Sequence, residues 1–364
     1  MEQDMTVTTK YWAAQQTQTG VTEAAAALAA GGVVAFPTET VYGLGGDARS
    51  TAAVERIFSA KGRPSDNPLI VHLAHGEEVY SLAERVNEVE RVLMATFWPG
   101  PLTLVLPLRA GAVSPLVTAG LDTVAVRVPA HELARSLIQR SGCPLAAPSA
   151  NRSGRPSPTQ ARHVMEDLNG RIDGVLDGGA TGVGLESTVV RVVEGKVHIL
   201  RPGGVTREQL QSAVGSTADV LSPKDSNSQA EAESVNHTER APRSPGVKYT
   251  HYAPKGEMLL IAGPLDKIVP AVQEKIDEAV RKGLRVAVIS CTEHASVYRA
   301  ETVLDCGPYR NPERAAHSLY ALLRECDERS IDFIVAEGYP EEGIGAALMN
   351  RMRKAAGGRE LTVS

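Results

Sequence analysis

Hydroxyl, amide and cationic side chains recur around the apolar runs of this 364-residue sequence. Thr38, Glu39 and Thr40 follow the run "VVAF", and the run "PLIVHL" carries His72. The other clusters are Lys61, Arg63, Asp66 and Asn67; Thr118, Thr123 and Arg127; Ser149, Asn151, Ser153, Arg155 and Ser157; Glu186, Ser187, Thr188 and Arg191; and Arg201. Arginine and lysine, together with hydroxyl and glycine backbone donors, match the oxygens of a phosphate group. The pattern therefore predicts a phosphate-binding site.

No short motif identifies this site alone, and each residue also has an ordinary structural interpretation. The phosphate-binding loop G-x-x-x-x-G-K-[ST] is absent. Lys61 and Arg63 could instead form a local salt bridge with Asp66, and His72 on an apolar run fits a core histidine. The glycines of "VYGLGG" fit turns, and His163 fits a surface position. The joint occurrence of the clusters favours the functional interpretation over all of these together.

The elements that must position these clusters alternate between strand and helix patterns, which predicts an α/β catalytic domain over 14–210. Strands are expected at "VVAF", "PLIVHL", "LTLVLPL", "TVAVRVP", "PLAAPS" and "GVLDGG", and a hairpin at "STVVRVV" and "KVHILRP". Helices are expected at "VTEAAAALAAGG", which begins near Thr22, and at "TAAVERIFSAKG", "HELARSLIQRSG" and "SPTQARHVMEDLNG". In open α/β sheets ligands usually bind beyond the strand ends, where most of the polar clusters fall.

The chain changes character after residue 210. Residues 211–254 are polar and lack hydrophobic periodicity, so we expect a linker or a mobile loop. Its end, "SPGVKYTHYAP", is rich in rings, which is unusual for an inert tether. Residues 255–364 predict a smaller Rossmann-like α/β domain with strands at "MLLIAG", "RVAVIS", "ETVLDC" and "IDFIVAEG". Its helices are expected at about 266–282, 312–329 and 343–356.

Composition excludes several classes of protein. The net charge of −5 gives no global basic footprint of the kind that many nucleic-acid binders carry. The four cysteines are scattered and form no C-x-x-C, so buried reduced thiols are expected rather than disulfides or a zinc site. The N-terminus lacks the pattern of a signal peptide, and no apolar run reaches membrane-spanning length. We therefore expect a cytoplasmic protein.

The motifs taken together resemble the threonylcarbamoyl-AMP synthase family. The resemblance rests on "FPTETVYGLG", "KGRPSDNPLIVH", "WPGPLTLVL", "TAGLDTVAVRVP", "PLAAPSANRSGRPSPT", "ESTVV" and "LRPGG". It covers the whole YrdC-like domain, for which it implies a twisted mixed sheet with helices. The trailing "SPGVKYTHYAP" and the module after it resemble the long, two-domain form of the family, in which the smaller Rossmann-like domain follows a linker.

The resemblance implies a nucleotidyltransferase that condenses L-threonine, bicarbonate and ATP into threonylcarbamoyl-adenylate and releases pyrophosphate. A downstream threonylcarbamoyl transferase would then modify the adenosine next to the anticodon of tRNA, which leaves room for a weak tRNA contact by this protein. By motif, the threonine-binding residues would be Thr40, His72, Arg127, Ala147 and Ser187. The ATP-binding residues would be Arg63, Asn67, Thr123, Ser149, Asn151, Ser157, Arg201, Tyr249 and Tyr252, with Lys61 lining the same cleft.

This reaction fits the residue inventory. It needs no protein nucleophile, because the enzyme has only to hold two anionic reactants together, which contributes roughly 7–11 kcal/mol through positioning. Lys61 and Arg63 are the expected catalytic cations, with magnesium on the phosphates and no tightly bound organic cofactor. Arg127 suits the threonine carboxylate, because a guanidinium fork matches two carboxylate oxygens. Tyr249 and Tyr252 offer flat faces for an adenine, so the linker end is expected to act as an active-site lid.

Three other interpretations remain open. An RNA-binding protein would use the same cations on a basic concave face, but it does not explain the hydroxyl-rich strand ends or the lack of an aromatic stacking platform. A carbamoyl transferase of the hydrogenase-maturation type shares this domain, but it also carries zinc-finger cysteines and an acylphosphatase module that are missing here. In the third interpretation, the second domain is purely structural and the linker is an inert tether.

Overall fold

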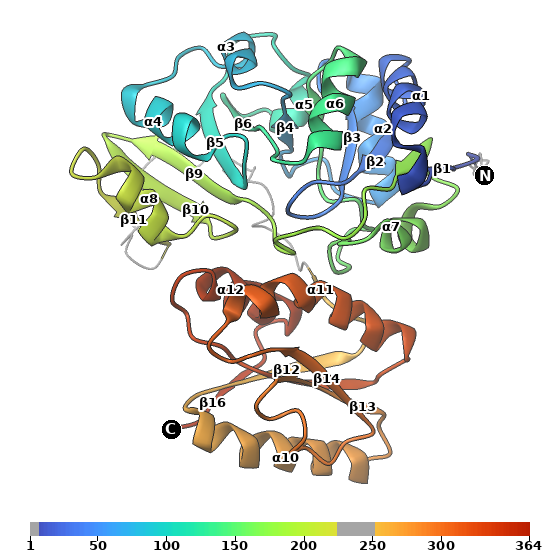
Figure 1. Ribbon diagram of the computed structural model, residues 1–364, viewed down its shortest axis with the longest axis vertical. Helices are drawn as coiled ribbons and strands as arrows, with labels where there is room; N and C mark the ends of the chain where they lie inside the picture. The colour runs from blue at the N-terminus through green and yellow to red at the C-terminus, as the bar shows by residue number, and fades with distance from the viewer. Residues whose placement is uncertain (1–6, 224–251) are drawn as a thin grey trace. The chain divides into compact units, whose positions relative to one another are not determined.

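The computed structural model describes residues 7–223 and 252–364 and contains two compact units (Figure 1). Of the described residues, the first unit contains 7–153, 158–182 and 186–223. The second unit contains 252–364 together with two short segments, 154–157 and 183–185. Each unit has a sheet and a hydrophobic core of its own.

The first unit is built on a mixed sheet. Over the described residues its strand order is β1-β8-β2-β3-β7-β4-β6-β5-β9-β10-β11. The strands are β1 (Lys10–Trp12), β2 (Val34–Phe36), β3 (Gly43–Asp47), β4 (Ile70–His72), β5 (Leu102–Pro107), β6 (Thr123–Arg127), β7 (Leu145–Ala146), β8 (Gly174–Leu176), β9 (Thr188–Val193), β10 (Lys196–Arg201) and β11 (Val220–Leu221). Strand β6 pairs in parallel with β4 and antiparallel with β5, which confirms the expected mixed sheet.

The helices of the first unit begin and end at recognisable signals. They are α1 (Thr17–Ala29), α2 (Thr51–Lys61), α3 (Val79–Leu82), α4 (Glu88–Phe97), α5 (Pro115–Thr118), α6 (Glu132–Ser141), α7 (Ala161–Leu168) and α8 (Arg207–Val214). Helix α2 begins after Ser50, whose hydroxyl accepts from Ala53 N, and ends at Gly62 in the left-handed conformation with φ 60°. This cap leaves Lys61 at the last helical position.

Side chains along the central strands point alternately to the two faces of the first sheet, and the two faces differ. One face packs into the large core, to which Val71, Leu104, Val126 and Val190 belong. The other face carries a small separate cluster of Ile70, Val105, Ala125 and Val189. Because side chains alternate along a strand, residues two positions from these lie on the same face. The second face therefore also carries polar residues that the sequence singled out.

Several sequence expectations of the first unit are confirmed, and three are wrong. The hairpin turns at Glu194 and Gly195, which have φ of 51° and 75°. Helix α1 begins at Thr17, so Thr22 lies inside it, where its hydroxyl donates to Gln18 O. His163 was expected at the surface, but it is buried, and its Nδ1 accepts from Thr159 N.

The third wrong expectation concerns the glycines of "VYGLGG", which form strand β3 rather than turns. Two of them pack closely against the ring of Phe36. A Cβ added at Gly45 would lie 2.7 Å from the Phe36 ring atom Cε1, and one at Gly43 would lie 3.2 Å from its Cζ. The third, Gly46, faces Ile57 and Ala53 of α2 instead.

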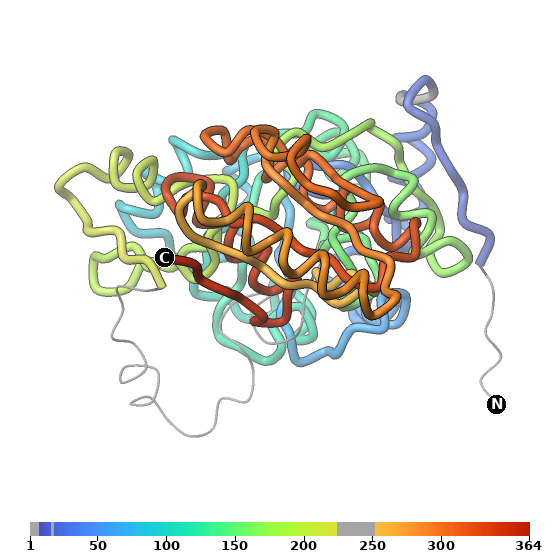
Figure 2. The backbone as a smooth tube through the Cα atoms, turned by 90° about the horizontal axis from the view of Figure 1, so that it is seen from below, coloured from blue at the N-terminus to red at the C-terminus, as the bar shows by residue number. Residues whose placement is uncertain are grey.

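The second unit is an open parallel sheet in the order β14-β13-β15-β12-β16 over the described residues. Its strands are β12 (Glu257–Ala262), β13 (Val286–Cys291), β14 (Thr302–Gly307), β15 (Phe333–Glu337) and β16 (Glu360–Thr362). Its helices are α10 (Leu265–Arg281), α11 (Pro312–Glu328) and α12 (Gly345–Ala355). Helices α11 and α12 lie on one face of this sheet and α10 on the other (Figures 1 and 2). The expected Rossmann-like α/β unit is confirmed.

Three further observations bear on the sequence expectations. The expected boundary at residue 210 falls inside α8, and β11 extends the first sheet to residue 221. The four cysteines are buried and unpaired, as expected. Within the described ranges, no helix is both long and apolar enough to cross a membrane.

Candidate active site

The turn after β2 places a buried hydroxyl against a buried guanidinium. Thr38 Oγ1 donates to Val41 O at 2.6 Å and accepts from Thr40 N at 3.1 Å, which holds the turn. The Thr40 hydroxyl lies 2.8 Å from Thr38 Oγ1 and accepts from Arg127 Nη1 at 2.9 Å. Because Thr38 already donates to Val41, the Thr40 hydroxyl is the donor between the two threonines. Thr40 and Arg127, both predicted to bind threonine, therefore form one fixed unit.

Arg127 also faces a carboxylate. Its Nη2 lies 2.6 Å from Glu39 Oε1, and its Nε donates to Gly100 O at 3.1 Å. The close approach to Glu39 is an ion pair without hydrogen-bond geometry, so neither Nη2 nor the two carboxylate oxygens has a hydrogen-bond partner among the described residues. Arg127 is only 3% exposed. Buried polar groups usually find hydrogen-bond partners, so this pair has capacity for a polar ligand.

His72 lies beside Arg127 in the sheet register. The two residues are paired at the ends of the parallel strands β4 and β6. His72 is buried, its Nδ1 donates to Ile70 O at 3.3 Å, and its ring meets Phe36 edge-on. Burial, reinforced by the positive charge of Arg127, lowers the pKa of His72 to about 3. The imidazole is therefore neutral near pH 7, and its Nε2 is a hydrogen-bond acceptor.

Ser187 and Arg201 meet at the start of β9. Ser187 Oγ lies 2.8 Å from Thr103 Oγ1, and Arg201 Nη2 donates to Ser187 O at 2.9 Å and to its Oγ at 3.2 Å. All three residues are buried. Strand β9 runs parallel to β5, and β5 pairs with β6, which places Ser187 level with the Arg127 end of β6. The structure thus brings a residue predicted for threonine and one predicted for ATP into contact.

Lys61 is held by the loop after β7. Its Nζ donates to Ser149 O and Asn151 O, each at 2.5 Å, and Ser149 Oγ donates to Asn151 Oδ1 at 2.5 Å. Lys61 is 2% exposed. Two backbone carbonyls therefore fix the ammonium of Lys61 in this loop.

Arg63, Asn67 and Thr123 lie at the opposite end of the same strands. Arg63 Nη2 approaches Asn67 O and Pro68 O at 3.4 Å just before β4, and Thr123 begins β6. Arg127 lies four positions after Thr123 on β6. At a rise of roughly 3.3 Å per residue, the two lie about 13 Å apart along one strand face. The predicted threonine residues and most predicted ATP residues therefore occupy two ends of one surface.

Three further predicted residues differ in their placement. Ala147 N donates to Ile70 O at 2.9 Å, which puts Ala147 next to His72. Ser157 is buried and belongs to a segment that groups with the second unit. Tyr252 also lies in the second unit, where its ring stacks on Tyr320 at 5.3 Å and Arg351 lies over it at 5.4 Å. Its contact with ATP stays a prediction.

The expected lid lies mostly outside the described residues. Tyr249 and the rest of 224–251 are not described.

Between the two ends lies the small apolar cluster on the second face of the sheet. His72 lies two positions from Ile70 on β4, and Thr123 and Arg127 each lie two positions from Ala125 on β6. All five therefore share one face of the sheet. An apolar floor with a few convergent polar groups at its rim is typical of a small-molecule site. The geometry fits a ligand with an anionic group at each end and an apolar part between them.

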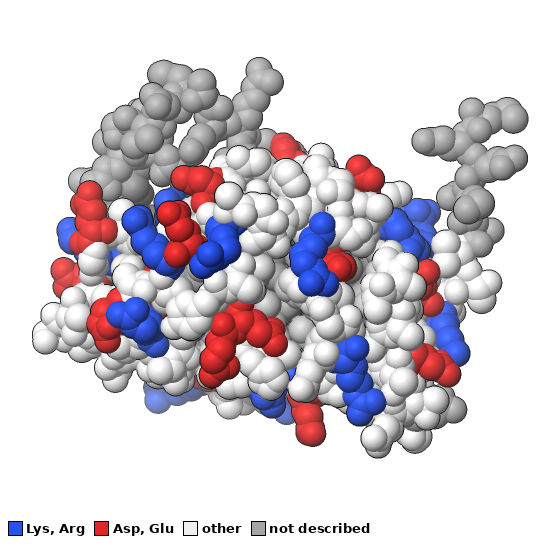
Figure 3. Space-filling view, turned by 90° about the horizontal axis from the view of Figure 1, so that it is seen from above, with Lys and Arg blue, Asp and Glu red and all other residues white. Residues whose placement is uncertain are grey.

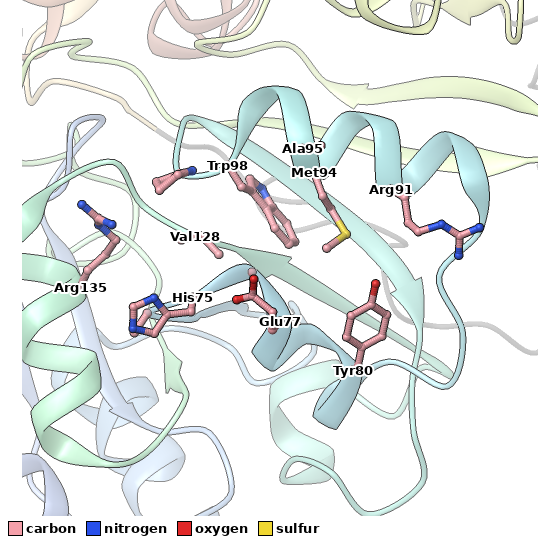
Figure 4. Close-up of a pocket in the computed structure, with 12 residues that line it drawn as sticks. His75, Glu77, Tyr80, Arg91, Met94, Ala95, Trp98, Val128 and Arg135 are labelled. Atoms are coloured by element: carbon pink, nitrogen blue, oxygen red, sulfur yellow. The ribbon is translucent and has the colours of Figure 1, made fainter.

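A separate hollow of about 570 Å³ adjoins the same strand ends, but none of the predicted residues lines it. Met94 and Trp98 line it from α4 and the end of that helix, Tyr80 lines it from α3, and Arg91 and Arg135 lie at its two ends (Figure 4). Ala74 and Val128 connect it in sequence to His72 and Arg127. It is therefore a neighbour of the candidate site and not the site itself. On the face shown in Figure 3, acidic and basic side chains alternate, so this face presents no continuous basic stripe for RNA.

Sequence reasoning missed two residues of this constellation as site residues. Glu39 was named only as part of a polar cluster, although it pairs with Arg127. Thr103 lies within the apolar run "LTLVLPL", and only its alternation with Leu102 and Leu104 marks it as facing the other way.

Two family models match the chain. One, described as telomere recombination, matches residues 26–203. The other, described as the C-terminal domain of threonylcarbamoyl-AMP synthase, matches residues 205–357.

Curated relatives and a solved structure agree with these models over nearly the whole chain. The threonylcarbamoyl-AMP synthase of Bacillus subtilis is 49% identical over 93% of both chains. That of Pyrococcus abyssi is 46% identical over 92% of this chain and 93% of its own. A crystal structure of the P. abyssi protein complexed with L-threonine has a TM-score of 0.86 and 42% identity, and it covers 98% of this chain and 99% of that one.

Proposed function

This chain belongs to the threonylcarbamoyl-AMP synthase family, and on that premise we propose that it joins L-threonine, bicarbonate and ATP into threonylcarbamoyl-adenylate with release of pyrophosphate. The observation that carries the proposal is Arg127, a buried guanidinium at a strand end with one amino group lacking hydrogen-bond geometry. The P. abyssi relative, whose structure is a complex with L-threonine, supports the assignment of the amino acid.

The Arg127 end of the surface would bind threonine. A guanidinium offers parallel N–H groups that match both oxygens of the threonine carboxylate. Thr40 holds one amino group of Arg127, so the fork has a fixed orientation before the substrate arrives. Neutral His72 supplies an acceptor in reach of an N–H or O–H of the bound amino acid.

The bond changes are carried by the substrates themselves. The threonine nitrogen attacks the carbonyl carbon of bicarbonate, water leaves, and a carbamate forms. A carbamate oxygen then attacks the α-phosphorus of ATP as the bond to pyrophosphate breaks. The protein must hold both anions in line and compensate the charge that develops on the phosphates.

Lys61, Arg63 and Arg201 would supply that compensation. Lys61 is fixed by two carbonyls, and Arg201 contacts Ser187, so both cations are held before ATP binds. Magnesium, when bound, would neutralise phosphate oxygens. It would be held by the phosphates rather than by Glu39, because Arg127 already engages that carboxylate.

The product would be an acyl-adenylate that water hydrolyses, so we expect a downstream threonylcarbamoyl transferase to consume it. That enzyme would place the group on the tRNA adenosine next to the anticodon.

A pyrophosphate-release assay tests the proposal. Purified full-length protein is incubated with ATP and Mg²⁺, and threonine and bicarbonate are omitted in turn. Release should require both, and mass spectrometry should detect threonylcarbamoyl-adenylate. Serine lacks one methyl group, worth about 1–3 kcal/mol in an apolar pocket, so it should react more slowly.

The matched control is valine, which has the shape of threonine but lacks its hydroxyl. Turnover that is equal without bicarbonate, or equal with valine, would overturn the proposed reaction or its hydroxyl-reading pocket respectively.

A further inference from the structure

The parallel sheet of the second unit has a point where the chain leaves two neighbouring strands in opposite directions. Strands β13 and β15 are adjacent. From β13 the chain continues to β14 on one side, and from β15 it continues through α12 to β16 on the other. Ligands of open α/β sheets usually bind outside the carboxyl ends of strands at such a point.

Three side chains that can bind a metal meet at this point. Cys291 is the last residue of β13, Glu337 is the last residue of β15, and His294 follows Cys291 by three residues. Their candidate ligand atoms all lie within 4.8 Å of one another, and no other such trio is found among the described residues. Cys291 and Glu337 are buried, while the His294 side chain is 14% exposed.

Hydrogen bonds hold this cluster in place. Glu337 Oε2 accepts from Cys291 N at 2.6 Å, and Glu337 Oε1 lies 2.7 Å from His294 Nδ1. The Tyr298 hydroxyl also donates to Glu337 Oε1. A carboxylate that is oriented by a tyrosine and a backbone N–H has the support that metal-binding carboxylates usually receive from the surrounding shell.

The charge of the cluster favours a cation. Glu337 is only 1% exposed, and no lysine or arginine of the described residues forms an ion pair with it. A divalent cation bound here would compensate the charge of this buried carboxylate.

We propose that Cys291, His294 and Glu337 form a binding site for a zinc-class divalent ion at the carboxyl edge of the second sheet. One thiolate, one imidazole and one carboxylate suit Zn²⁺, whereas Mg²⁺ and Ca²⁺ prefer oxygen ligands alone. Binding breaks the S–H bond of Cys291 and releases that proton to solvent. The Nδ1 proton of His294 moves to Nε2 through solvent, so the contact between Nδ1 and Glu337 is exchanged for two bonds to the metal. A fourth position remains for water or an added ligand.

A hollow of about 350 Å³ lies close to the site in sequence, but none of the three proposed ligands lines it. It is lined by Thr292, which follows Cys291, and by Asp305, Gly307, Pro308, Asn311 and Arg314. Sequence reasoning did not expect a zinc site because it looked for paired cysteines. This site has one cysteine and recruits its other ligands from a loop and a second strand.

The test uses the full-length protein after treatment with a chelator. Titration with Co²⁺ alone should produce visible d–d bands of a tetrahedral site and a near-ultraviolet sulfur-to-cobalt charge-transfer band. Added Zn²⁺ should remove both stoichiometrically. Cys291→Ser should abolish the charge-transfer band, and His294→Ala should weaken Co²⁺ affinity at least about 10-fold.

Cys306→Ser is the matched control, because Cys306 is another buried thiol of the same sheet, outside the trio. It should leave the band unchanged. Circular dichroism shows whether each variant is folded. If Cys291→Ser does not fold, the loss of Co²⁺ affinity in His294→Ala tests the site instead. A folded wild-type protein without the charge-transfer band, or a band that survives Cys291→Ser, would show that the cluster is a hydrogen-bonded tether only.

Discussion

Each unit of this protein places a carboxylate against a nitrogen-bearing side chain at strand ends, but the two pairs differ in how fully they are satisfied. Glu39 faces Arg127 without hydrogen-bond geometry, and its side chain is 16% exposed. Glu337 accepts from a backbone N–H, an imidazole and a hydroxyl and is 1% exposed. The first pair keeps polar capacity for an exchanging substrate, whereas the second is fully hydrogen-bonded within its own chain when no metal is bound.

The largest expected effect is the loss of folding stability in acid that His72, the neighbour of Arg127, confers on the protein. Unfolded His72 takes up a proton below pH 6.5, but folded His72 does so only near its pKa of about 3. The unfolded state therefore binds more protons in this window, and the free energy of unfolding falls as pH drops from 6.5 towards 3, by about 3 kcal/mol at pH 4. Chemical denaturation at pH 7 and pH 4 measures this loss.

The matched variants are His72→Phe and His75→Phe. The first should lose most of this pH dependence and the second should keep it, because His75 is exposed. An identical pH slope in wild type and His72→Phe would contradict the low pKa.

The next effect is on substrate affinity. Arg127→Lys keeps the charge but loses the fork that matches a carboxylate, so KM for threonine should rise roughly 30-fold, or about 2 kcal/mol, with little change in KM for ATP. Steady-state pyrophosphate release measures both constants. Arg135→Lys, on the rim of the separate hollow, is the control. Equal rises in both constants would mean that Arg127 serves the whole site rather than threonine.

Stability should separate the two carboxylates. Glu337→Gln turns one acceptor into a donor that faces other donors, so it should lower the free energy of unfolding by about 2 kcal/mol. Glu39→Gln loses no hydrogen bond, so its cost is limited to the lost attraction to Arg127 and should stay below that of Glu337→Gln. Denaturant unfolding of metal-free protein compares them. A larger cost for Glu39→Gln would reverse the comparison.

The smallest effect comes from one donor to the satisfied carboxylate. Tyr298→Phe removes only the hydroxyl that donates to Glu337 and should cost about 1 kcal/mol. Tyr11→Phe is a suitable control, since its hydroxyl donates to Asp177 at an exposed position. The same denaturant unfolding measures both losses of free energy. Equal small losses would mean that the hydroxyl of Tyr298 contributes no more than an ordinary surface hydrogen bond.

Local patterns determined much of this protein from the sequence alone. Strand and helix periods place most elements, since alternation and capping act within a few residues, as the hairpin at Glu194 and the cap at Gly62 illustrate. Helix α4 was missed, although its capping box of Asn87 and Glu90 was readable. The motifs identified the family and named Thr40, His72 and Arg127, which the structure brings together.

Only the tertiary structure decided what these residues contact. The pairing of Glu39 with Arg127, of Lys61 with the carbonyls after β7, and of Cys291 with Glu337 joins segments 46 to 90 residues apart. No local period encodes such a distance, because strand order sets which strand ends become neighbours. Gly43 and Gly45 of β3 show the same limit, since the ring of Phe36 on the neighbouring strand leaves no room for a side chain at either position. Sequence supplied the groups that can react, and the order of the strands decided which of them meet.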